Sequence, residues 1–368
     1  MIRLSALLTS LLVATTGVGR AATDWPLWKS YVAAFMDNQI RVIDHDSGDR
    51  TTSEGQAYAM FFALVADDRT RFDGLLRWTE VNLASGDLTA RLPAWSWGLA
   101  KNNQWAVLDS NSAADADVWM AYSLLEAGHA WNEPRYTALG TALAKRIAAE
   151  EVFREADVGP VLLPGPNGFR SANSYRLNAS YLPPQLFLRL AHELPDGPWR
   201  KIATHVPDLV HDSAPHGFVT DWMDVNSGGV SPSAVGSYDA IRVYLWAGML
   251  DPATPGRGAI LKALSGMANY LHSNPTPPAK VKQDGSIEDA KGPVGFSAAL
   301  LPYLSALGEK ELEGAQNSRL RAEFDPKSGL YGKPARYYDQ NLAMFALGWT
   351  ERRFWFDSQA NLKMPWEH

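Results

Sequence analysis

Apolar residues recur at helical spacing along most of the chain, and the clearest example is the stretch SEGQAYAMFFALVADD at Ser53–Asp68. One side of the helix predicted there carries Ala57, Met60, Phe61 and Leu64. Ser53 is the expected N-cap, and Gln56 three residues later would complete a capping box. Glu54 falls in the first turn, where a carboxylate interacts favourably with the helix dipole. Its position fits either that role or a role in chemistry.

A second apolar pattern follows directly, so the two predicted helices form a hairpin. Its apolar side carries Phe72, Leu75, Leu76, Thr79 and Leu83. Similar helix starts recur at intervals of about 60 residues, and they open the stretches Ser110–Gly128, Leu177–Ala191, Gly236–Gly248, Gly292–Gly308 and Tyr337–Trp349. Six such hairpins predict an all-α fold, a closed (α/α)6 barrel in a single domain whose inner helices all start at one end. An open helical solenoid would produce the same spacing.

The composition is that of a globular protein, and it argues against some classes of partner. Of 368 residues, 46% are hydrophobic and 20% are charged, and no linker divides the chain. The net charge is −6 and no basic block interrupts the sequence, so neither nucleic acid nor an anionic membrane surface is an expected partner. The absence of cysteine excludes disulfides and a thiolate zinc site. We expect a monomer.

The first residues, MIRLSALLTSLLVATTGVGRAA, have the pattern of a secretory signal peptide, with Arg3 before an apolar run and small residues at its end. We therefore expect residues 1–21 to be removed and residues 22–368 to form the mature domain, in the periplasm or secreted. No later segment approaches the roughly 18 unbroken apolar residues that a membrane-spanning helix needs, so membrane insertion is not expected.

Three acids occupy the predicted helix starts: Glu54, Asp115 and Asp239. If these starts gather at one end of a ring, the three carboxyl groups face one cleft. Small residues flank each acid and an apolar helix follows it, which favours a shared site over three separate dipole contacts. A protonated carboxyl beside an ionised one is the arrangement that hydrolysis of a glycosidic bond requires.

Aromatic residues make up 11% of the chain, and fourteen of them are tryptophan. Such a content fits a large core, and it also fits a protein that stacks sugar rings on indoles. The segments LPAWSWG, NNQWAVLDS and FVTDWMD supply Trp95, Trp97, Trp105 and Trp222 near the acids in sequence. Trp95, Trp97 and Trp105 are the candidate sugar platforms, and we expect about half of them to belong to the core instead.

Other kinds of chemistry have weaker support in the sequence. The eight histidines are scattered, with His205, His211 and His216 the nearest set, and no HExxH spacing occurs. We therefore expect no metal and no other cofactor. The G-x-S-x-G turn of serine hydrolases is absent, and the glycine-bearing VNSGGVSPS segment has no lysine behind it.

Five motifs resemble those of glycoside hydrolase family 8 and occur in that family's order: SEGQAYAM, SAADADVWMAYSLLEAGHAW, NASYLPP, TDWM and SYDAIRVYLW. The resemblance covers nearly the whole mature chain. It implies an inverting enzyme on an (α/α)6 barrel that cuts β-1,4-glucan, such as cellulose and cello-oligosaccharides, internally. The run KGPVGFSAALLPYL resembles members encoded with bacterial cellulose synthase, which makes that complex a candidate partner.

Carried onto matching positions, the resemblance implies that Glu54 is the general acid and Asp239 the base that activates water. Asp115 would hydrogen-bond the distorted sugar at the cleavage point, with Asp117 the competing choice in the same motif. The two carboxyls of an inverting pair stand roughly 6.5–9.5 Å apart to leave room for the water.

Two further residues can each be interpreted in two ways. Arg242, nearly one helical turn beyond Asp239, would either orient the base or form a surface ion pair. Tyr181 in NASYLPP would either hydrogen-bond near the reacting water or fill the core.

Three alternatives stay open at the level of function. A polysaccharide lyase on the same ring would rely on tyrosine, histidine and arginine. A non-catalytic glycan-binding protein would not need a working acid–base pair. Within the family, xylan, mixed-linkage glucan and chitosan are alternative substrates.

Overall fold

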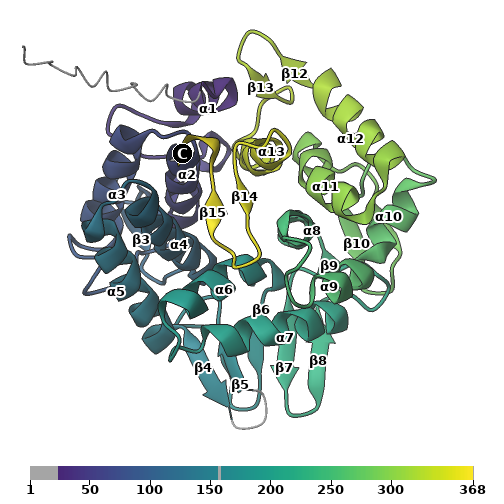
Figure 1. Cartoon of the computed structure of the whole chain (residues 1–368), viewed down its shortest axis with the longest axis horizontal. Coiled ribbons are helices and arrows are strands. Elements are labelled where there is room, and N and C mark those ends of the chain that lie inside the picture. Colours follow the sequence, from purple (N-terminus) through teal and green to yellow (C-terminus); the bar gives the residue numbers. More distant parts are fainter. Residues whose placement is uncertain (1–23, 156–158, 368) are drawn as a thin grey trace, which may run out of the picture.

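The computed structural model describes residues 24–155 and 159–367, and these residues form a ring of helices in two layers (Figure 1). The inner helices are α2 (Ser53–Val65), α4 (Ala114–Ala130), α6 (Pro184–Glu193), α8 (Ala240–Met249), α11 (Val294–Leu307) and α13 (Tyr337–Thr350). Around them lie α1 (Pro26–Phe35), α3 (Arg69–Leu83), α5 (Pro134–Glu150), α7 (Trp199–Asp212), α9 (Arg257–Ala263), α10 (Ser265–Leu271) and α12 (Lys310–Ala322). Because α13 contacts α2, the ring is closed and the open solenoid is excluded. The predicted (α/α)6 barrel is confirmed.

The sixth hairpin is completed by a helix from the other end of the chain. No α-helix follows α13 within the described residues, and α1 packs beside α13 instead. The Arg353 guanidinium, just after α13, donates to the Asp24 carbonyl at 3.0 Å, just before α1. The sixth hairpin is therefore held together by packing contacts rather than by a direct chain connection.

The start of α2 differs from the predicted capping box. The N-cap is Thr52, whose Oγ1 accepts from the Gly55 amide at 3.1 Å, and Ser53 is already inside the helix. The Gln56 side chain points away from the helix start, and its Oε1 accepts from the Val42 amide at 2.7 Å. The prediction was wrong because extended backbone runs up to Thr52, which leaves that residue in the capping conformation.

The inner helices are buried on nearly all sides, and much of the tryptophan content belongs to the core. Trp119, Trp199 and Trp246 are among the largest fully buried side chains. Packing between α8 and α11 is especially close at Gly248, where a Cβ would lie 2.2 Å from the Tyr303 backbone nitrogen. The core therefore extends through the centre of the ring.

Short antiparallel sheets, which the helical periodicity did not predict, connect the hairpins. Three have three strands: β1 (Thr51–Thr52) with β2 (Ser96–Leu99) and β3 (Trp105–Asp109), β6 (Tyr175–Leu177) with β7 (Met223–Asn226) and β8 (Gly229–Pro232), and β9 (Val235–Gly236) with β10 (Lys280–Lys282) and β11 (Ile287–Asp289). Three have two: β4 (Val152–Glu155) with β5 (Gly159–Leu162), β12 (Phe324–Asp325) with β13 (Leu330–Tyr331), and β14 (Trp355–Phe356) with β15 (Leu362–Lys363). Three 3-10 turns are η1 (His45–Ser47), η2 (Ala179–Tyr181) and η3 (Pro365–Glu367).

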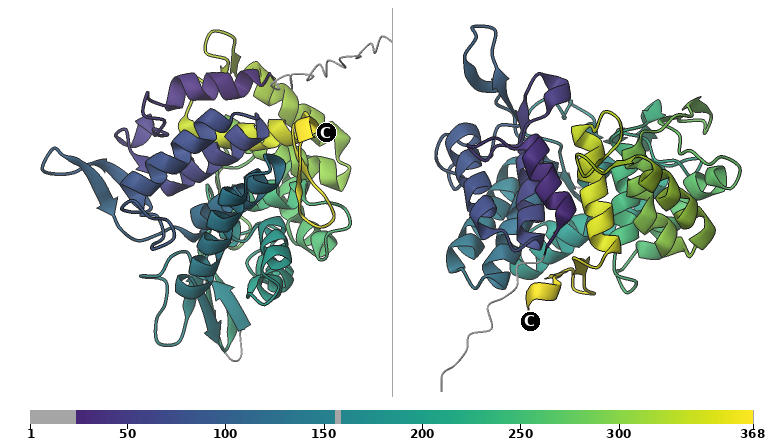
Figure 2. Two further views of the ribbon diagram at one scale, coloured as in Figure 1. Left: turned by 60° about the vertical axis from the view of Figure 1, so that its left-hand side comes forward. Right: turned by 90° about the horizontal axis from the view of Figure 1, so that it is seen from above.

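The two ends of the ring are covered differently. The β2–β3 hairpin projects from the end opposite the C-terminal segment (Figure 2, right). That segment packs where inner helices finish: the Leu362 amide donates to Glu126 Oε2 at 2.7 Å, and Trp366 Nε1 donates to the Val65 carbonyl at 2.9 Å. The end with the helix starts is therefore the end left available for a site.

The predicted signal peptide, residues 1–21, lies outside the described residues. Within the part of the chain that the structure describes, every helix is too short or too polar to cross a membrane.

Candidate active site

The starts of the inner helices enclose a pocket of about 250 Å³ that brings the predicted acids together. Its lining consists of Asp44, Arg50, Thr52, Ser53, Glu54, Trp95, Ala113, Asp115, Tyr181, Asp239, Arg242, Tyr337 and Tyr338. Glu54 comes from the first turn of α2, Asp115 from the first turn of α4, and Asp239 is the N-cap of α8. The fold therefore collects three carboxyl groups from separate hairpins at one end of the ring.

Arg242 lies at the centre of this group. Its Nη1 donates to Glu54 Oε2 and, at 3.1 Å, to Asp115 Oδ2, and its Nη2 donates to Asp239 Oδ1 at 2.6 Å. Only 3% of the Arg242 side chain is exposed, so the surface ion pair considered for this residue is wrong. Arg242 reaches Asp239 because the two are three residues apart at the start of α8.

Neutral groups also accept from the guanidinium, whose buried Nε has no partner among the described residues. Arg242 Nη1 also donates to the Tyr58 hydroxyl at 3.1 Å, and Nη2 donates to Ser180 Oγ at 3.0 Å. The reasoning from sequence missed both partners. Tyr58 follows Glu54 by four residues, so the helical period alone would have placed them on one face.

One guanidinium does not balance three carboxylates, and burial adds to the cost of their ionisation. Burial raises the pKa of Asp115 to about 7, although Arg242 opposes this shift and the charge of Glu54 adds to it. Burial likewise raises the pKa of Asp239, against the opposing effect of Arg242. The pocket therefore takes up a proton more readily than separate, solvated carboxyls would.

The two acids of the Asp115–Asp117 motif occupy different places. Asp115 lines the pocket, whereas Asp117 is completely buried and is not part of the pocket lining. Burial and the neighbouring Glu151 carboxyl raise the pKa of Asp117 well above its usual range. Of the two, only Asp115 lines the pocket.

Asp221 is a neighbour of the start of α8 that the sequence did not indicate. Its carboxylate accepts from the Ser237 amide at 2.6 Å, from the Ser237 hydroxyl at 2.6 Å and from the Ala240 amide at 2.9 Å. These bonds fix the start of α8, and so they fix the position of Asp239. The TDWM motif carried this residue, but nothing in its spacing indicated the contact.

Of the three candidate sugar platforms, one lies in the pocket and two lie outside it. Trp95 lines the pocket, with the Arg50 guanidinium 5.3 Å from its ring centre. Trp97 and Trp105 stack on each other in the β2–β3 hairpin, with ring centres 5.0 Å apart. Trp105 is 46% exposed, and the Arg41 guanidinium lies 4.9 Å from its ring centre, so part of this indole reaches solvent.

A second aromatic group lies beside Tyr181. Trp222 stacks on Phe169 with ring centres 5.9 Å apart and planes 7° apart, and its ring centre is 6.3 Å from that of Tyr181. All three side chains are half-buried. Tyr181 therefore connects the pocket lining to an aromatic surface next to the β6–β7–β8 sheet.

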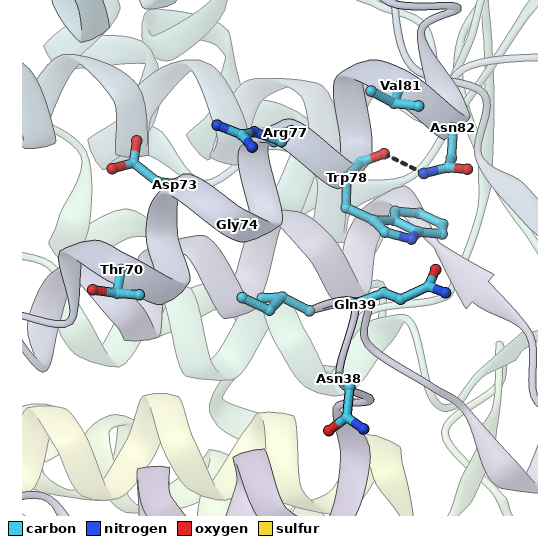
Figure 3. Close-up of a pocket in the computed structure, with 10 residues that line it drawn as sticks. Asn38, Gln39, Thr70, Asp73, Gly74, Arg77, Trp78, Val81 and Asn82 are labelled. Carbon is cyan, nitrogen blue, oxygen red and sulfur yellow. Dashed lines mark hydrogen bonds between the residues drawn. The ribbon is translucent and has the colours of Figure 1, made fainter.

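A larger pocket, of about 470 Å³, lies between α3 and the segment after α1 (Figure 3). It is lined by Asn38, Gln39, Ile40, Thr70, Asp73, Gly74, Arg77, Trp78, Val81 and Asn82. Asp73 is its only acid, and that carboxylate already accepts from Tyr136 and Arg135. This pocket lacks a pair of carboxyls and does not match the requirements of glycosidic hydrolysis.

Among the described residues, no group of three or more His, Cys, Asp or Glu side chains is arranged to hold a metal ion.

Comparisons with known proteins identify the family of the chain. The family model of glycosyl hydrolases family 8 matches residues 2–352. An endoglucanase of Escherichia coli K12 is 43% identical over 371 residues, which cover 98% of this chain and 96% of the relative. An endoglucanase of Xanthomonas axonopodis pv. citri is 44% identical over 347 residues, with coverage of 93% and 89%.

Solved structures show the same fold. The endo-1,4-D-glucanase of Vibrio fischeri superposes with a TM-score of 0.87 at 38% identity, covering 94% of this chain and 100% of the other. A cold-adapted family 8 xylanase shares the fold with a TM-score of 0.68 at 18% identity, with coverage of 92% and 91%. With the family model matched over nearly its whole length, the chain belongs to glycosyl hydrolases family 8.

Proposed function

We propose that this chain is an endo-β-1,4-glucanase that hydrolyses its substrate with inversion, using Glu54 as general acid and Asp239 as general base. The observation that carries the proposal is that one buried guanidinium, Arg242, pairs with both carboxyls. The near full-length similarity to endoglucanases supports the substrate class, and inversion is general to the family.

Inversion sets a requirement on the spacing of the two carboxyls. Glu54 and Asp239 bind different terminal nitrogens of the same guanidinium, so one group relates their positions. An inverting pair needs roughly 6.5–9.5 Å between its carboxyls, enough for a water beside the sugar. A retaining pair stands closer, since its nucleophile attacks the sugar directly.

The leaving group needs a proton, and the excess of negative charge in the pocket favours the uptake of one. Three ionised carboxyls with one guanidinium would leave a net charge of −2 in a partly buried site, so uptake of one proton relieves repulsion. In this proposal Glu54 donates that proton to the glycosidic oxygen of the leaving group.

Asp115 and Tyr181 hold the sugar at the cleavage point in this proposal. Asp115 Oδ2 is fixed by Arg242, and the Asp115 carboxylate accepts hydrogen bonds from sugar hydroxyls. Tyr181 lines the same pocket, and the Arg242 Cζ is 5.7 Å from the centre of its ring. The Tyr181 hydroxyl is a donor for the sugar or for the reacting water.

Aromatic side chains give the glucan a path along the surface. Trp95 stacks the sugar nearest the pocket, and the Trp97–Trp105 pair continues the path on the β2–β3 hairpin. Trp222 and Phe169 supply a second surface from the β6–β7–β8 side, which lies elsewhere on the ring (Figure 1). Aromatic surfaces on two sides of the acids suit cleavage within a chain.

The cellular role proposed here rests on the sequence pattern and on the resemblance to members encoded with cellulose synthase. Residues 1–21 are removed as a signal peptide, and residues 22–368 act as the catalytic domain in the periplasm on glucan made by the synthase. N-terminal sequencing of the protein from a periplasmic fraction tests this role.

The test of the activity follows the product anomer by proton NMR, with wild type, Glu54→Gln and Asp239→Asn on carboxymethyl cellulose and soluble cello-oligosaccharides. Initial release of the α-anomer by wild type, lost in both variants, is the expected result. A β-anomer contradicts inversion. Cleavage of xylan, mixed-linkage glucan or chitosan in preference to cello-oligosaccharides contradicts the proposed substrate. Binding of the glucan without hydrolysis contradicts the proposed enzymatic activity.

A further inference from the structure

A buried arginine, Arg41, lies beside the indole pair of the β2–β3 hairpin. Its guanidinium carbon is 5.1 Å from the ring centre of Trp97 and 4.9 Å from that of Trp105, and the two ring centres are 5.0 Å apart. A guanidinium within about 6 Å of an indole centre is attracted by the negative potential of the ring. Because Arg41 is buried, water and salt screen this attraction little. One cation therefore contacts both members of the stack.

Hydrogen bonds to groups other than the indoles fix the guanidinium in this position. Arg41 Nε donates to Asp37 Oδ2 at 2.9 Å, and the Arg41 amide donates to Asp37 Oδ1 at 3.2 Å. Arg41 Nη1 donates to the Asp49 carbonyl and to Thr51 Oγ1, both at 2.9 Å. Thr51 is the residue of β1 that pairs with Trp97 of β2. The arginine is therefore tied to the strands that carry the first indole.

The sheet register explains why the two indoles meet. Trp97 on β2 pairs with Val107 on β3, and Leu99 pairs with Trp105. The indoles are therefore diagonal neighbours on one face of the hairpin, where large aromatic side chains reach each other. Trp78 on α3 packs edge-on against Trp97, with ring centres 5.2 Å apart. Trp97 is thus the supported member of the stack, and Trp105, at 46% exposure, is the outer one.

We propose that Arg41 is a positioning residue that holds the Trp97–Trp105 stack in place as a sugar subsite of the glucan path. This inference rests on the proposed glucanase function and names the residue on which that subsite depends. Ordering a mobile side chain when a ligand binds costs conformational entropy, which weakens binding. Arg41 orders the indoles before the glucan arrives. Its effect is on the binding of glucan long enough to reach the hairpin, and not on the step at the acids.

Arg41→Met tests this inference because it keeps an unbranched stem but removes the charge and the donors. KM for long cello-oligosaccharides is expected to rise about fivefold. The value of kcat and the KM of the shortest cleaved oligosaccharides are expected to stay at the wild-type values, since the lost contact contributes only to binding at the hairpin. Arg41→Lys keeps the charge but has no planar group to lie against two rings. A smaller rise in the same direction is expected, and this variant carries the test if Arg41→Met does not fold.

A double variant and a matched control separate the positioning of the stack from general support of the fold. In the Trp105→Ala background, Arg41→Met is expected to add no further rise in KM, because the outer indole is already gone. The control is Arg353→Met. Its guanidinium likewise lies 5.5 Å from an indole centre, that of Trp25, and donates to the Asp24 carbonyl, but it follows the last turn of α13. KM of this control is expected to match wild type at both substrate lengths.

Circular dichroism supplies a readout besides activity. Two stacked indoles couple their ultraviolet transitions, and the difference spectrum between wild type and Trp105→Ala isolates the signal of this pair. Arg41→Met is expected to lose most of that signal, whereas Arg353→Met is expected to keep it. Thermal unfolding checks that each variant is folded.

Three results would overturn the inference in an active enzyme. The first is a wild-type KM for long substrates in folded Arg41→Met, and the second is an equal rise for long and short substrates or in Arg353→Met. The third is a full further rise of KM when Arg41→Met is added to Trp105→Ala. If wild type itself hydrolyses no β-glucan, the proposed function fails instead. The circular dichroism signal of Arg41→Met then decides alone whether Arg41 positions the stack.

Discussion

Arg242 on α8 and Glu54 on α2 form an ion pair across 188 residues of sequence. Because the same guanidinium holds Asp239 and Asp115, one side chain relates the proposed acid, base and sugar-orienting carboxyl to each other. The separation of the acid from the base therefore depends on a single rigid, planar group.

Arg242→Lys tests whether this shape matters apart from the charge. A lysine keeps the positive charge but cannot bridge two carboxyls in a fixed geometry. We expect kcat to fall about 10²-fold or more, since misplacement by 1 Å is enough for such a loss. Arg135→Lys, at an exposed arginine on α5, is the control and should keep wild-type kcat. Wild-type kcat in Arg242→Lys would show that charge alone suffices.

The aromatic path predicts a dependence on substrate length. Trp105→Ala removes the exposed indole of the β2–β3 stack, and the expected rise in KM is about tenfold for long cello-oligosaccharides and negligible for the shortest cleaved ones. Trp95→Ala should impair every substrate, because that indole lines the pocket of the acids. Val81→Ala, at an exposed side chain elsewhere, is the control. Equal losses on long and short substrates would place Trp105 outside the path.

Burial of Glu151 predicts how stability changes with pH. Its pKa is raised from 4.5 to about 8 in the folded protein, chiefly by burial. The folded state therefore holds the proton more tightly than the unfolded state, and wild type loses stability as the pH rises through this interval. Glu151→Gln lacks this titration.

The unfolding free energy of Glu151→Gln relative to wild type should accordingly increase from pH 5 to pH 8. Denaturant titrations at several pH values measure this difference. The exposed Glu288→Gln variant should show a constant difference over the same range. A constant or decreasing difference for Glu151→Gln would contradict the raised pKa.

Close packing of α8 on α11 predicts opposite effects for two glycine substitutions. At Gly248 a Cβ would lie 2.2 Å from the Tyr303 nitrogen and 2.3 Å from the Pro302 carbonyl carbon, both backbone atoms, so Gly248→Ala should destabilise by about 1–3 kcal/mol or more. At Gly314, on exposed α12, a Cβ meets nothing within 4 Å, and Gly314→Ala should stabilise by about 0.5–1 kcal/mol. Equal melting temperatures for the two variants would contradict the packing.

Much of the barrel could be predicted because its inner helices are apolar and start in similar ways. The six predicted starts correspond to α2, α4, the η2–α6 segment, α8, α11 and α13. Periodicity did not reveal that α1 completes the sixth hairpin, since a pairing between chain ends has no local signal. It also missed the short strands, whose few residues pair across loops rather than within a hydrophobic repeat.

The acids of the candidate site could be predicted from their positions, but their surroundings could not. Glu54, Asp115 and Asp239 stand at helix starts, and a ring necessarily brings such starts together. The contacts of Asp221 and Glu151 depend on how loops and helix ends pack. The burial of Asp117 beside Glu151 likewise depends on α4 packing against α5, which one motif does not encode.

The pairing of α1 with α13 has a consequence for how the protein is made. Synthesis produces α1 before α13, so α1 cannot pack against its partner until the residues up to Thr350 have been made. Contacts between such distant segments carry a large loop-closure entropy and slow the search for the native topology. Any fragment lacking either end would leave an apolar helix face uncovered, and the acids, which depend on the inner helices for their arrangement, would have no complete ring to hold them.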